Sequence, residues 1–475
     1  MRFYTRRNIL CAVALAAATT LSGCVLAPRG TDAEQAKLRA AGANLEKPME
    51  QRQLPELPSP ATWQDVLGRA FLANGELESA YFDWKAALTR IPQVADYPNT
   101  NVAAGFSYMF SGENLKGWNR TTLTGGFDGM ENLSFPTKVM QAGKIALDEA
   151  RAAGEKFRAT KFELQRKVLS SYLDLALMEE KIRIADDNVS LLKMLADTAQ
   201  NRVQTGGNQV DLLKAQTAYR LAENELETMK SQASAMRAML NGMLARDANA
   251  AIDLPPTLPD SRPIPVDDAA LIAVAVDQNP ELAKLARQVE GRTDAIELAK
   301  MGFIPDINPA VALTGNVSQA IGAVIILPTT IPEIQGRIDE SRAMLRSEQA
   351  MLRQTRAERG AKFIASLYVL RNSERQAKLF EETILPRARQ ALDSSRQNYA
   401  TGSGTYMDLI DSQRTVLDVR LMIAEARIER EKQLVEIEAL AGTDIETLSQ
   451  STTAPTTSPT KIDANAQASK ERNHE

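Results

Sequence analysis

The chain has 475 residues and a formal charge of −4 at pH 7, and its length alone suggests about two to four domains. It contains one histidine, His474, and two cysteines, Cys11 and Cys24, which excludes a histidine-based triad, a Cys/His metal site and a disulfide framework. Its mildly acidic composition gives no support for nucleic-acid binding. Carboxylate chemistry stays possible from this inventory, but no catalytic arrangement of carboxylates is recognisable. We expect a protein that is not an enzyme, without a metal and without a cofactor other than a covalent lipid.

Residues 1–23 have the organisation of an export signal. A basic start is followed by an apolar run from Ile9 to Leu21, which is too short for a stable membrane span. The run ends in Leu21-Ser22-Gly23-Cys24, which resembles the bacterial lipobox, in which the cysteine is acylated and becomes the new N-terminus. The alternative is a chance cysteine after an apolar run. We expect a covalent lipid, palmitate among its chains, on Cys24, and an extended segment over residues 24–60.

The first repeat unit is expected over residues 61–247. It starts with short helices over about 61–92, followed by period-2 alternation that predicts a strand hairpin over about 101–136. From Met140 to Gln204 there is no proline, and apolar residues recur in steps of three and four, which is typical of coiled-coil packing. A helix of that length is about 100 Å long.

Residues 248–265 form a proline-rich linker, and a second unit is expected over residues 266–445. It has the same order: a helix over about 266–300, a strand hairpin over about 306–328, a long helical run and a last helix. That last helix has two apolar stripes, which predicts packing against a neighbour on each side. The Ser/Thr/Pro-rich tail, residues 446–475, is predicted to be disordered.

The two units are copies of one repeat. The run Asp211 to Gln216 is echoed by Asp408 to Gln413, and Gly143-Lys144-Ile145 is echoed by Gly336-Arg337-Ile338, with offsets of 197 and 193 residues. Landmarks in the same order at a nearly constant offset indicate an internal duplication.

The break between the last two helices carries a specific motif. Residues Tyr399 to Gln413 read Tyr-x-x-Gly, then Asp408-Leu409-Ile410, then Ser412-Gln413. This motif resembles that of the TolC-like outer-membrane efflux proteins. The resemblance of the chain to that family extends over about residues 60–445. The first copy lacks the tyrosine, and its Gly206 lies one residue closer to the aspartate.

The resemblance implies a mainly α fold with a small β part, built from two structural repeats of strand-strand plus long coiled-coil helices. Three chains with four strands and four helical columns each would form a 12-strand β-barrel on a 12-helix α-barrel. Trimerisation would also remove the open sheet edges that a membrane does not tolerate.

The function implied is the exit duct of a tripartite efflux pump or type I secretion system. Such a duct conducts substrates passively from the periplasm or an inner-membrane transporter to the exterior. The implied partners are a second and third copy of the chain, a periplasmic adaptor (membrane-fusion) protein and an inner-membrane transporter of RND or ABC type. The expected location is the outer membrane, with a lipid anchor and a long periplasmic extension.

The resemblance also places two aspartates, Asp408 and Asp411, at the pore constriction. Carboxylates at i and i+3 share one helix face, so three chains would present stacked acidic rings. The alternative for Asp408 is a charge that interacts with the N-terminus of its helix. Asp211 is the first-repeat candidate for the constriction, although Lys214 stands where the second copy has Asp411.

Glycines at the two breaks are expected at the periplasmic tip, where an adaptor would dock and the helices would open like an iris. They are Gly206, Gly207, Gly402 and Gly404, and we expect them to supply the positive φ of a tight reversal.

A second class of function stays open from the sequence: a lipid-anchored periplasmic coiled-coil tether without a pore. The hairpins are short and poor in aromatic residues, so the sequence alone does not exclude it.

Overall fold

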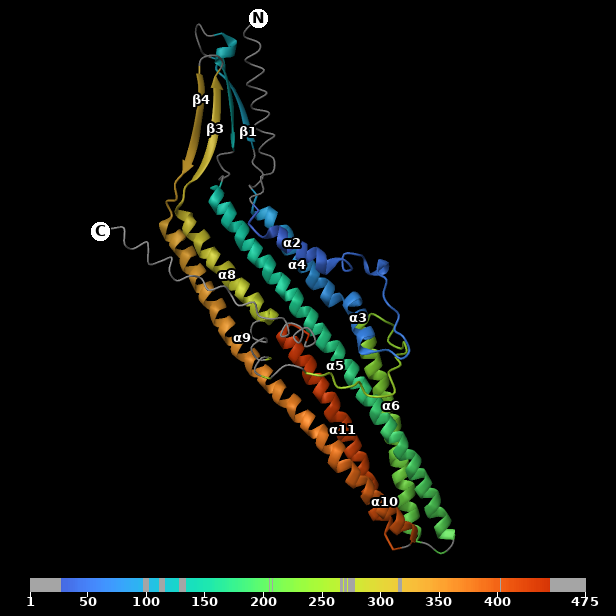
Figure 1. Ribbon diagram of the computed structural model, residues 1–475. Helices are drawn as coiled ribbons and strands as arrows, with labels where there is room; N and C mark the ends of the chain where they lie inside the picture. The colour runs from blue at the N-terminus through green and yellow to red at the C-terminus, as the bar shows by residue number, and fades with distance from the viewer. Residues whose placement is uncertain are drawn as a thin grey trace, which may run out of the picture.

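The computed structural model describes residues 27–96, 102–110, 116–127, 134–204, 206, 208–264, 268, 271, 278–314, 318–401 and 403–444. The protein is elongated, with a small sheet at one end and long helices that run together to the other end (Figure 1). The expected class, mainly helical with a small β part, is confirmed.

Helix α5 (Pro136–Gln204) is the longest element, with 69 residues. At 1.5 Å per residue it is about 100 Å long. Its one proline is Pro136, at the N-terminus, where a missing amide proton costs no helical hydrogen bond. Helices of both repeats pack along α5, so it lies inside the helical layer (Figure 1).

Three helices of the first repeat pack along one side of α5. They are α3 (Trp63–Ala73), α4 (Gly75–Val94) and α6 (Gln209–Met243). The end of α6 lies beside α3, where Arg69 donates a hydrogen bond to the Leu244 carbonyl at 3.2 Å. Short polar side chains cap these helices; Asn74, for example, accepts hydrogen bonds from the first amides of α4.

The second repeat contains α8 (Pro280–Lys300), α9 (Ile331–Leu379), a π-helical turn η4 (Phe380–Ile384), α10 (Leu385–Thr401) and α11 (Tyr406–Ala441). Helices α9 to α10 form one column, interrupted only by the π turn. Helix α11 contacts both α5 and α9, which confirms the predicted packing on two sides.

The end of α11 meets the start of α8 at Gly442. This residue has a left-handed φ of 65° and ends α11. The side-chain amide nitrogen of Asn279 donates to the Leu440 carbonyl, and its side-chain oxygen caps α8 by accepting from the Leu282 amide. Helix α8 therefore continues the column of α11 toward the sheet (Figure 1).

The prediction of an extended segment over residues 24–60 is wrong at two places within its described part. Residues Thr31–Gly42 form helix α2, and Met49–Gln51 form the short helix η1. The cause is tertiary: α2 packs against α4 and α5, and it lacks the strong apolar periodicity that would have revealed it from the sequence.

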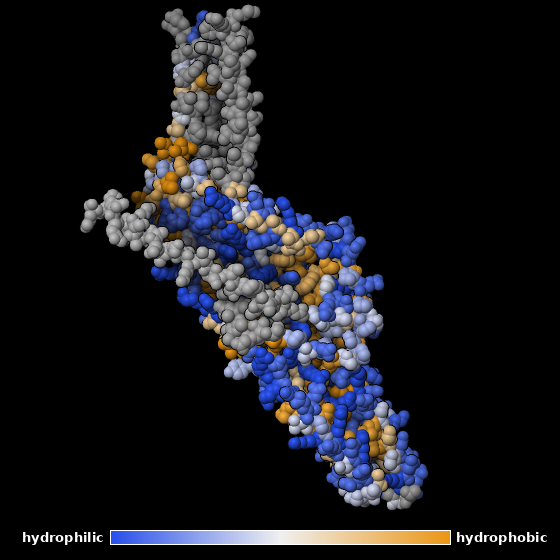
Figure 2. Space-filling model, viewed as in Figure 1, coloured by the Kyte–Doolittle hydropathy of each residue, from blue (hydrophilic) through white to orange (hydrophobic). Residues whose placement is uncertain are grey.

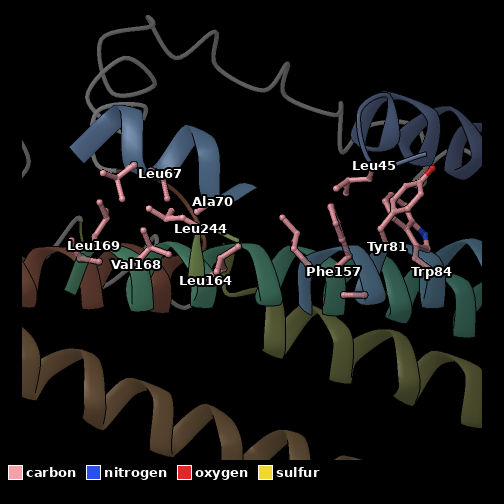
Figure 3. Close-up of a cluster of buried hydrophobic side chains, with 14 of the residues drawn as sticks. Leu45, Leu67, Ala70, Tyr81, Trp84, Phe157, Leu164, Val168, Leu169 and Leu244 are labelled. Atoms are coloured by element: carbon pink, nitrogen blue, oxygen red, sulfur yellow. The ribbon is translucent and has the colours of Figure 1, made fainter. Parts of the chain in front are cut away.

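A continuous core joins the N-terminal segment, α3, α4, α5 and α6 (Figure 3). Tyr81 and Trp84 of α4 pack against Phe157 of α5, and the Trp84 and Phe157 rings stack with centroids 5.7 Å apart. Small residues allow this approach: a Cβ at Gly154 would lie 2.9 Å from the Trp84 ring. The aromatic pairs fix α4 on α5.

The linker is held to α11 by buried ion pairs. Arg262 pairs with Glu431 and Glu438 of α11, at 3.2 and 3.0 Å, and its guanidinium lies over the Trp63 ring. Because Glu438 is almost fully buried, loss of Arg262 would leave a buried charge without this partner. The linker thus joins the two repeats.

The four described strands form one antiparallel sheet in the order β1-β2-β3-β4. They are β1 (Val102–Tyr108), β2 (Thr121–Phe127), β3 (Asp306–Thr314) and β4 (Ser318–Ile326). The pairing of β2 with β3 joins the two repeats, so both predicted hairpins contribute to one sheet. The predicted turn at Gly315 and Asn316 lies outside the described residues.

The register gives the sheet two different faces. Phe106 pairs with Leu123, and Leu123 pairs with Leu313, so these large apolar residues share one face. They are exposed in the single chain. The other face carries small and polar residues, such as Thr122 and Thr314, whose hydroxyls are 3.1 Å apart. Figure 2 shows apolar residues gathered where the sheet meets the helices, whereas much of the helical surface is hydrophilic.

Replacing Gly442 by alanine should destabilise the junction of α11 and α8. A Cβ there would lie 2.5 Å from Pro280 Cδ, and alanine at positive φ is itself strained, so we expect a loss of more than about 1 kcal/mol. The check is the midpoint of thermal unfolding of the detergent-solubilised protein, followed by circular dichroism.

The matched control is Gly68→Ala in α3, where a Cβ would meet nothing within 4 Å. This helical position should gain about 0.5–1 kcal/mol. Equal midpoints for the two variants would contradict the proposed role of Gly442.

Candidate functional site: the helical tip

Two tight turns form the end of the molecule farthest from the sheet (Figure 1). The first joins α5 to α6. Gly206 has a φ of 98° and donates its amide to the Val203 carbonyl at 3.1 Å, and Asn208 caps α6 through the Val210 amide. The predicted positive φ is therefore confirmed at Gly206.

The second turn joins α10 to α11 by a different device. The amides of Ser403 and Gly404 both donate to the Asn398 carbonyl at 2.9 Å. Gly404 does not have a positive φ, so that expectation is wrong at this position. Glycine is needed at this position to avoid a steric clash, because a Cβ would lie 2.9 Å from Asn398 Cβ.

Three of the predicted positions, Gly207, Gly402 and Cys24, lie outside the described residues. The described parts of the two turns contain Gly206 and Gly404.

Asp408 is the third residue of α11 and belongs to a capping box. Its carboxylate accepts hydrogen bonds from the Thr405 hydroxyl at 2.7 Å and the Thr405 amide at 3.2 Å, and the Thr405 hydroxyl accepts from the Asp408 amide. These bonds hold the pKa of Asp408 below its ordinary value of 3.8. The ionised carboxylate therefore stabilises the folded protein above pH 3.8, and this stabilisation is lost as the pH falls through the lower pKa of the folded state.

The other two aspartates have different surroundings. Asp411 is exposed one turn after Asp408, so the pair does share a helix face as i and i+3. Asp211 is half-buried in the first turn of α6, and its charge is among the causes that raise the pKa of Tyr406. Asp211 therefore lies at the contact between the two hairpins.

An aromatic and cationic contact joins the hairpins. Arg202, near the end of α5, lies over the Tyr399 ring at 4.1 Å and donates to the Tyr399 carbonyl at 2.9 Å. Tyr399 packs edge-on against Tyr406, whose pKa rises to about 12, mainly because it is buried. The sequence analysis did not identify Arg202. The only sequence feature that pointed to this contact was Tyr399, the tyrosine of the motif.

Small apolar residues fill the space beneath this contact. The cluster contains Ala196 and Ala199 of α5, Ala215 of α6, Leu392 of α10 and Leu409 of α11. Alanines at these seams let the helices approach closely, so the end of the molecule is one packed four-helix unit.

Two features are absent from the described residues as a whole. None of the described helices has the length and hydropathy that a membrane-spanning helix requires. Within the same described ranges, no group of three or more His, Cys, Asp or Glu residues is arranged to hold a metal ion.

The arrangement occurs in solved structures of outer-membrane channels. The structure of the outer membrane protein VceC from Vibrio cholerae covers 81% of this chain and 96% of its own, with a TM-score of 0.67 and 16% identity. At that identity the likeness establishes the fold. The fold of this chain is therefore that of solved outer-membrane channel proteins.

The sequence comparisons agree with the fold. Residues 271–443 match the family model described as outer membrane efflux protein. CzcC of Cupriavidus metallidurans, a cobalt-zinc-cadmium resistance protein, is 23% identical over 269 residues, 54% of this chain and 63% of its own. SilC of Salmonella typhimurium, a probable outer membrane lipoprotein, is 22% identical over 397 residues, 77% of this chain and 82% of its own.

The chain thus spans less than two thirds of CzcC but most of SilC. The fold and the family model point the same way: residues 271–443 match the outer membrane efflux protein family, and the chain is similar in sequence and fold to outer-membrane efflux proteins. The family consists of channel proteins and not of enzymes.

Thr405→Ala should open the start of α11. It removes the side chain that caps the Asp408 amide and orients its carboxylate, and loss of a cap costs about 1 kcal/mol, or about fivefold in a local opening equilibrium. Hydrogen exchange of the segment 405–412, measured by mass spectrometry, should become about fivefold faster.

Thr415→Ala is the matched control, because the Thr415 hydroxyl bonds back to the Asp411 carbonyl inside the same helix. It should leave exchange in the first turn unchanged. Unaltered exchange in Thr405→Ala would show that the capping box does not hold the turn.

Proposed function

We propose that the chain is one protomer of the outer-membrane exit duct of a tripartite efflux pump or type I secretion system. The observation that carries this proposal is a sheet with one large-apolar face joined directly to helices about 100 Å long. A face of large apolar residues suits contact with lipid, and helices of that length suit a conduit that crosses the periplasm.

The sheet supports a trimer in the membrane. Strands β1 and β4 are its two edges, and unpaired backbone groups are not tolerated in a hydrocarbon layer. Pairing of β4 with β1 of the next protomer satisfies both edges at once. Three copies then give the 12-strand barrel that the family resemblance implies.

Exposed apolar side chains on the outer helices support the same assembly. Helix α9 carries Ile364 and Tyr368, and α6 carries Leu221 and Met239, all exposed in the single chain. In the single chain α9 packs on α8 and α11, and α6 on α5. Burial of such side chains between neighbouring protomers contributes about 25 cal/mol for each Å² removed from water, which favours a closed ring of 12 helices.

The tip is the proposed gate and docking end. Three copies of Asp408 and Asp411 would place stacked acidic rings at the constriction, and Asp211 would stand behind them. The glycine turns at Gly206/Gly207 and Gly402/Gly404 would receive the periplasmic adaptor. The energy for transport would come from the inner-membrane transporter of RND or ABC type.

The start of the described chain fits a lipid anchor. Ala27 lies only three residues after Cys24, and the following segment packs along α4 and α5 just below the sheet (Figure 1). An acyl group on Cys24 would therefore reach the membrane that surrounds the sheet. Acyl chains contribute about 0.8 kcal/mol for each buried CH₂.

The double variant Asp408→Asn with Asp411→Asn should reduce cation selectivity, because carboxylate rings at a constriction favour cations. The measurement is the reversal potential of single channels in planar bilayers under a salt gradient. The control is Asp339→Asn with Asp393→Asn, which removes two exposed charges from α9 and α10. Equal reversal potentials in the tip variant and the wild type would remove Asp408 and Asp411 from the constriction, and absence of any conductance would favour the pore-free tether.

Cys24→Ser should abolish incorporation of labelled palmitate, whereas Cys11→Ser should not, because Cys11 lies within the expected signal. Cys24→Ser should still fractionate with the outer membrane, since the sheets hold the trimer there. Persistent labelling of Cys24→Ser would contradict the lipid anchor. Release of the variant into the soluble periplasm would instead support the tether.

A further inference from the structure

A cavity of about 470 Å³ lies between α4, α5 and α8, well away from the tip. Helices α4 and α8 lie on either side of α5 (Figure 1), so the cavity is a recess over α5 with walls from both neighbours. Nothing in the tip mechanism uses it.

The recess exists because small residues line its floor. They are Ala152 and Ala153 of α5 and Gly291 and Ala295 of α8. The residues that line the recess recur on each helix at about every third or fourth position, so they lie on one helix face. Close approach of α5 and α8 keeps the floor continuous: a Cβ at Gly291 would lie 3.5 Å from Asp148 Cβ.

The walls of the recess are strongly cationic. The lining has one carboxylate, Glu149, against five basic side chains. The basic side chains are Arg90, Lys156, Lys284, Arg287 and Arg292. They come from three helices, so their convergence is a property of the fold.

The cations remain available to a ligand. Four of them pair with carboxylates but keep 42–65% of their side chains exposed, and exposed pairs of this kind are weak. Two of the pairs are long, with Arg90–Glu149 at 3.4 Å and Arg292–Glu348 at 3.6 Å. Lys284 has no ion pair among the residues described by the structure.

The recess lies on the face of α5 opposite to the N-terminal segment. That segment contacts α5 at Gly143 and Gly154, where a Cβ would meet Pro28 and Glu34. Ile145 and Ala152 of the recess are each two residues from those positions. At about 100° per residue, two residues correspond to about 200° around the helix.

This geometry assigns the recess to the inside of the duct. The lipid on Cys24 must lie in the membrane outside the barrel, so the segment that follows it covers the outer face of the helical layer. The opposite face of α5 then lines the lumen. This step rests on the proposed function.

We propose that the recess is a transit site for organic anions: molecules with a small apolar body and a carboxylate, sulfonate or phosphate group. The alanine and glycine floor accepts the apolar body. The arginine and lysine walls bind the anionic group, for which the planar guanidinium is well suited. The duct would thereby favour anionic organic cargo before it passes the sheet.

The first experiment measures binding to the full-length, detergent-solubilised trimer by isothermal titration calorimetry. The probe is 2-naphthalenesulfonate, with uncharged 2-naphthylmethanol as its counterpart. We expect saturable binding of the sulfonate that weakens with added salt, and weaker binding of the alcohol. Equal affinities for the two probes would overturn the proposal.

The variants test the position of the site. Lys284→Gln with Arg292→Gln should weaken sulfonate binding about fivefold, since two wall charges are lost. The control, Lys300→Gln with Arg337→Gln, removes two basic side chains of α8 and α9 that do not line the recess. Equal affinities in the recess variant and the control would overturn the proposal.

The second experiment separates this inference from the function on which it rests. In planar bilayers, millimolar 2-naphthalenesulfonate should reduce single-channel current in the wild type and the control, and have less effect in Lys284→Gln with Arg292→Gln. Normal conductance that the sulfonate affects equally in all three proteins would overturn the transit site alone. Absence of conductance in the wild type would overturn the duct, and with it the lumenal assignment.

Discussion

Close packing on both sides of α5 positions the other parts of the chain. Helices α3, α4 and α6 pack on it from the first repeat, and α8 and α11 from the second. None of these neighbours matches its length; each covers only part of it and is continued by another helix along the same column. A continuous α5 therefore fixes the distance between the sheet and the tip. It also explains the small residues along its length, since helices on both sides must approach closely.

The corresponding column of the second repeat is built differently. It is interrupted by the π turn Phe380–Ile384, which ends two residues before Pro386. A proline cannot donate to the helical ladder, and the wider π turn absorbs the missing bond without ending the column. The contact between Arg427 and Glu381, at 2.6 Å, ties this turn to α11. The two hairpins at the tip therefore differ in the helix that leads into them. Helix α6 follows the continuous α5, whereas α11 follows a column that is widened by the π turn.

Much of this architecture could be predicted from the sequence because it depends on periodic patterns. Steps of three and four indicated the long helices, alternation indicated the strands, and the repeated Asp-Leu motif located both turns. Features that depend on tertiary contacts could not be predicted. Helix α2 has little periodicity of its own, Gly404 is required by the proximity of Asn398, and Arg202 meets Tyr399 from 197 residues away. Asp408 shows most clearly what a sequence cannot distinguish. A helix-capping role and a role at the pore constriction both require an aspartate at this position.

The duplication of the chain does not duplicate the cationic recess. With the offset of 193 residues between Gly143 and Gly336, Ala152 and Ala153 of α5 correspond to Leu345 and Arg346 of α9. The larger side chains would fill the floor that the two alanines leave open, so the equivalent groove beside α9 cannot have the same depth. Ile145, by contrast, corresponds to Ile338, which is buried as part of the shared helical scaffold. The duplication thus keeps Ile145, which also lines the recess, and changes the two alanines of the floor, so the hollowed floor is not a feature that the repeat imposes.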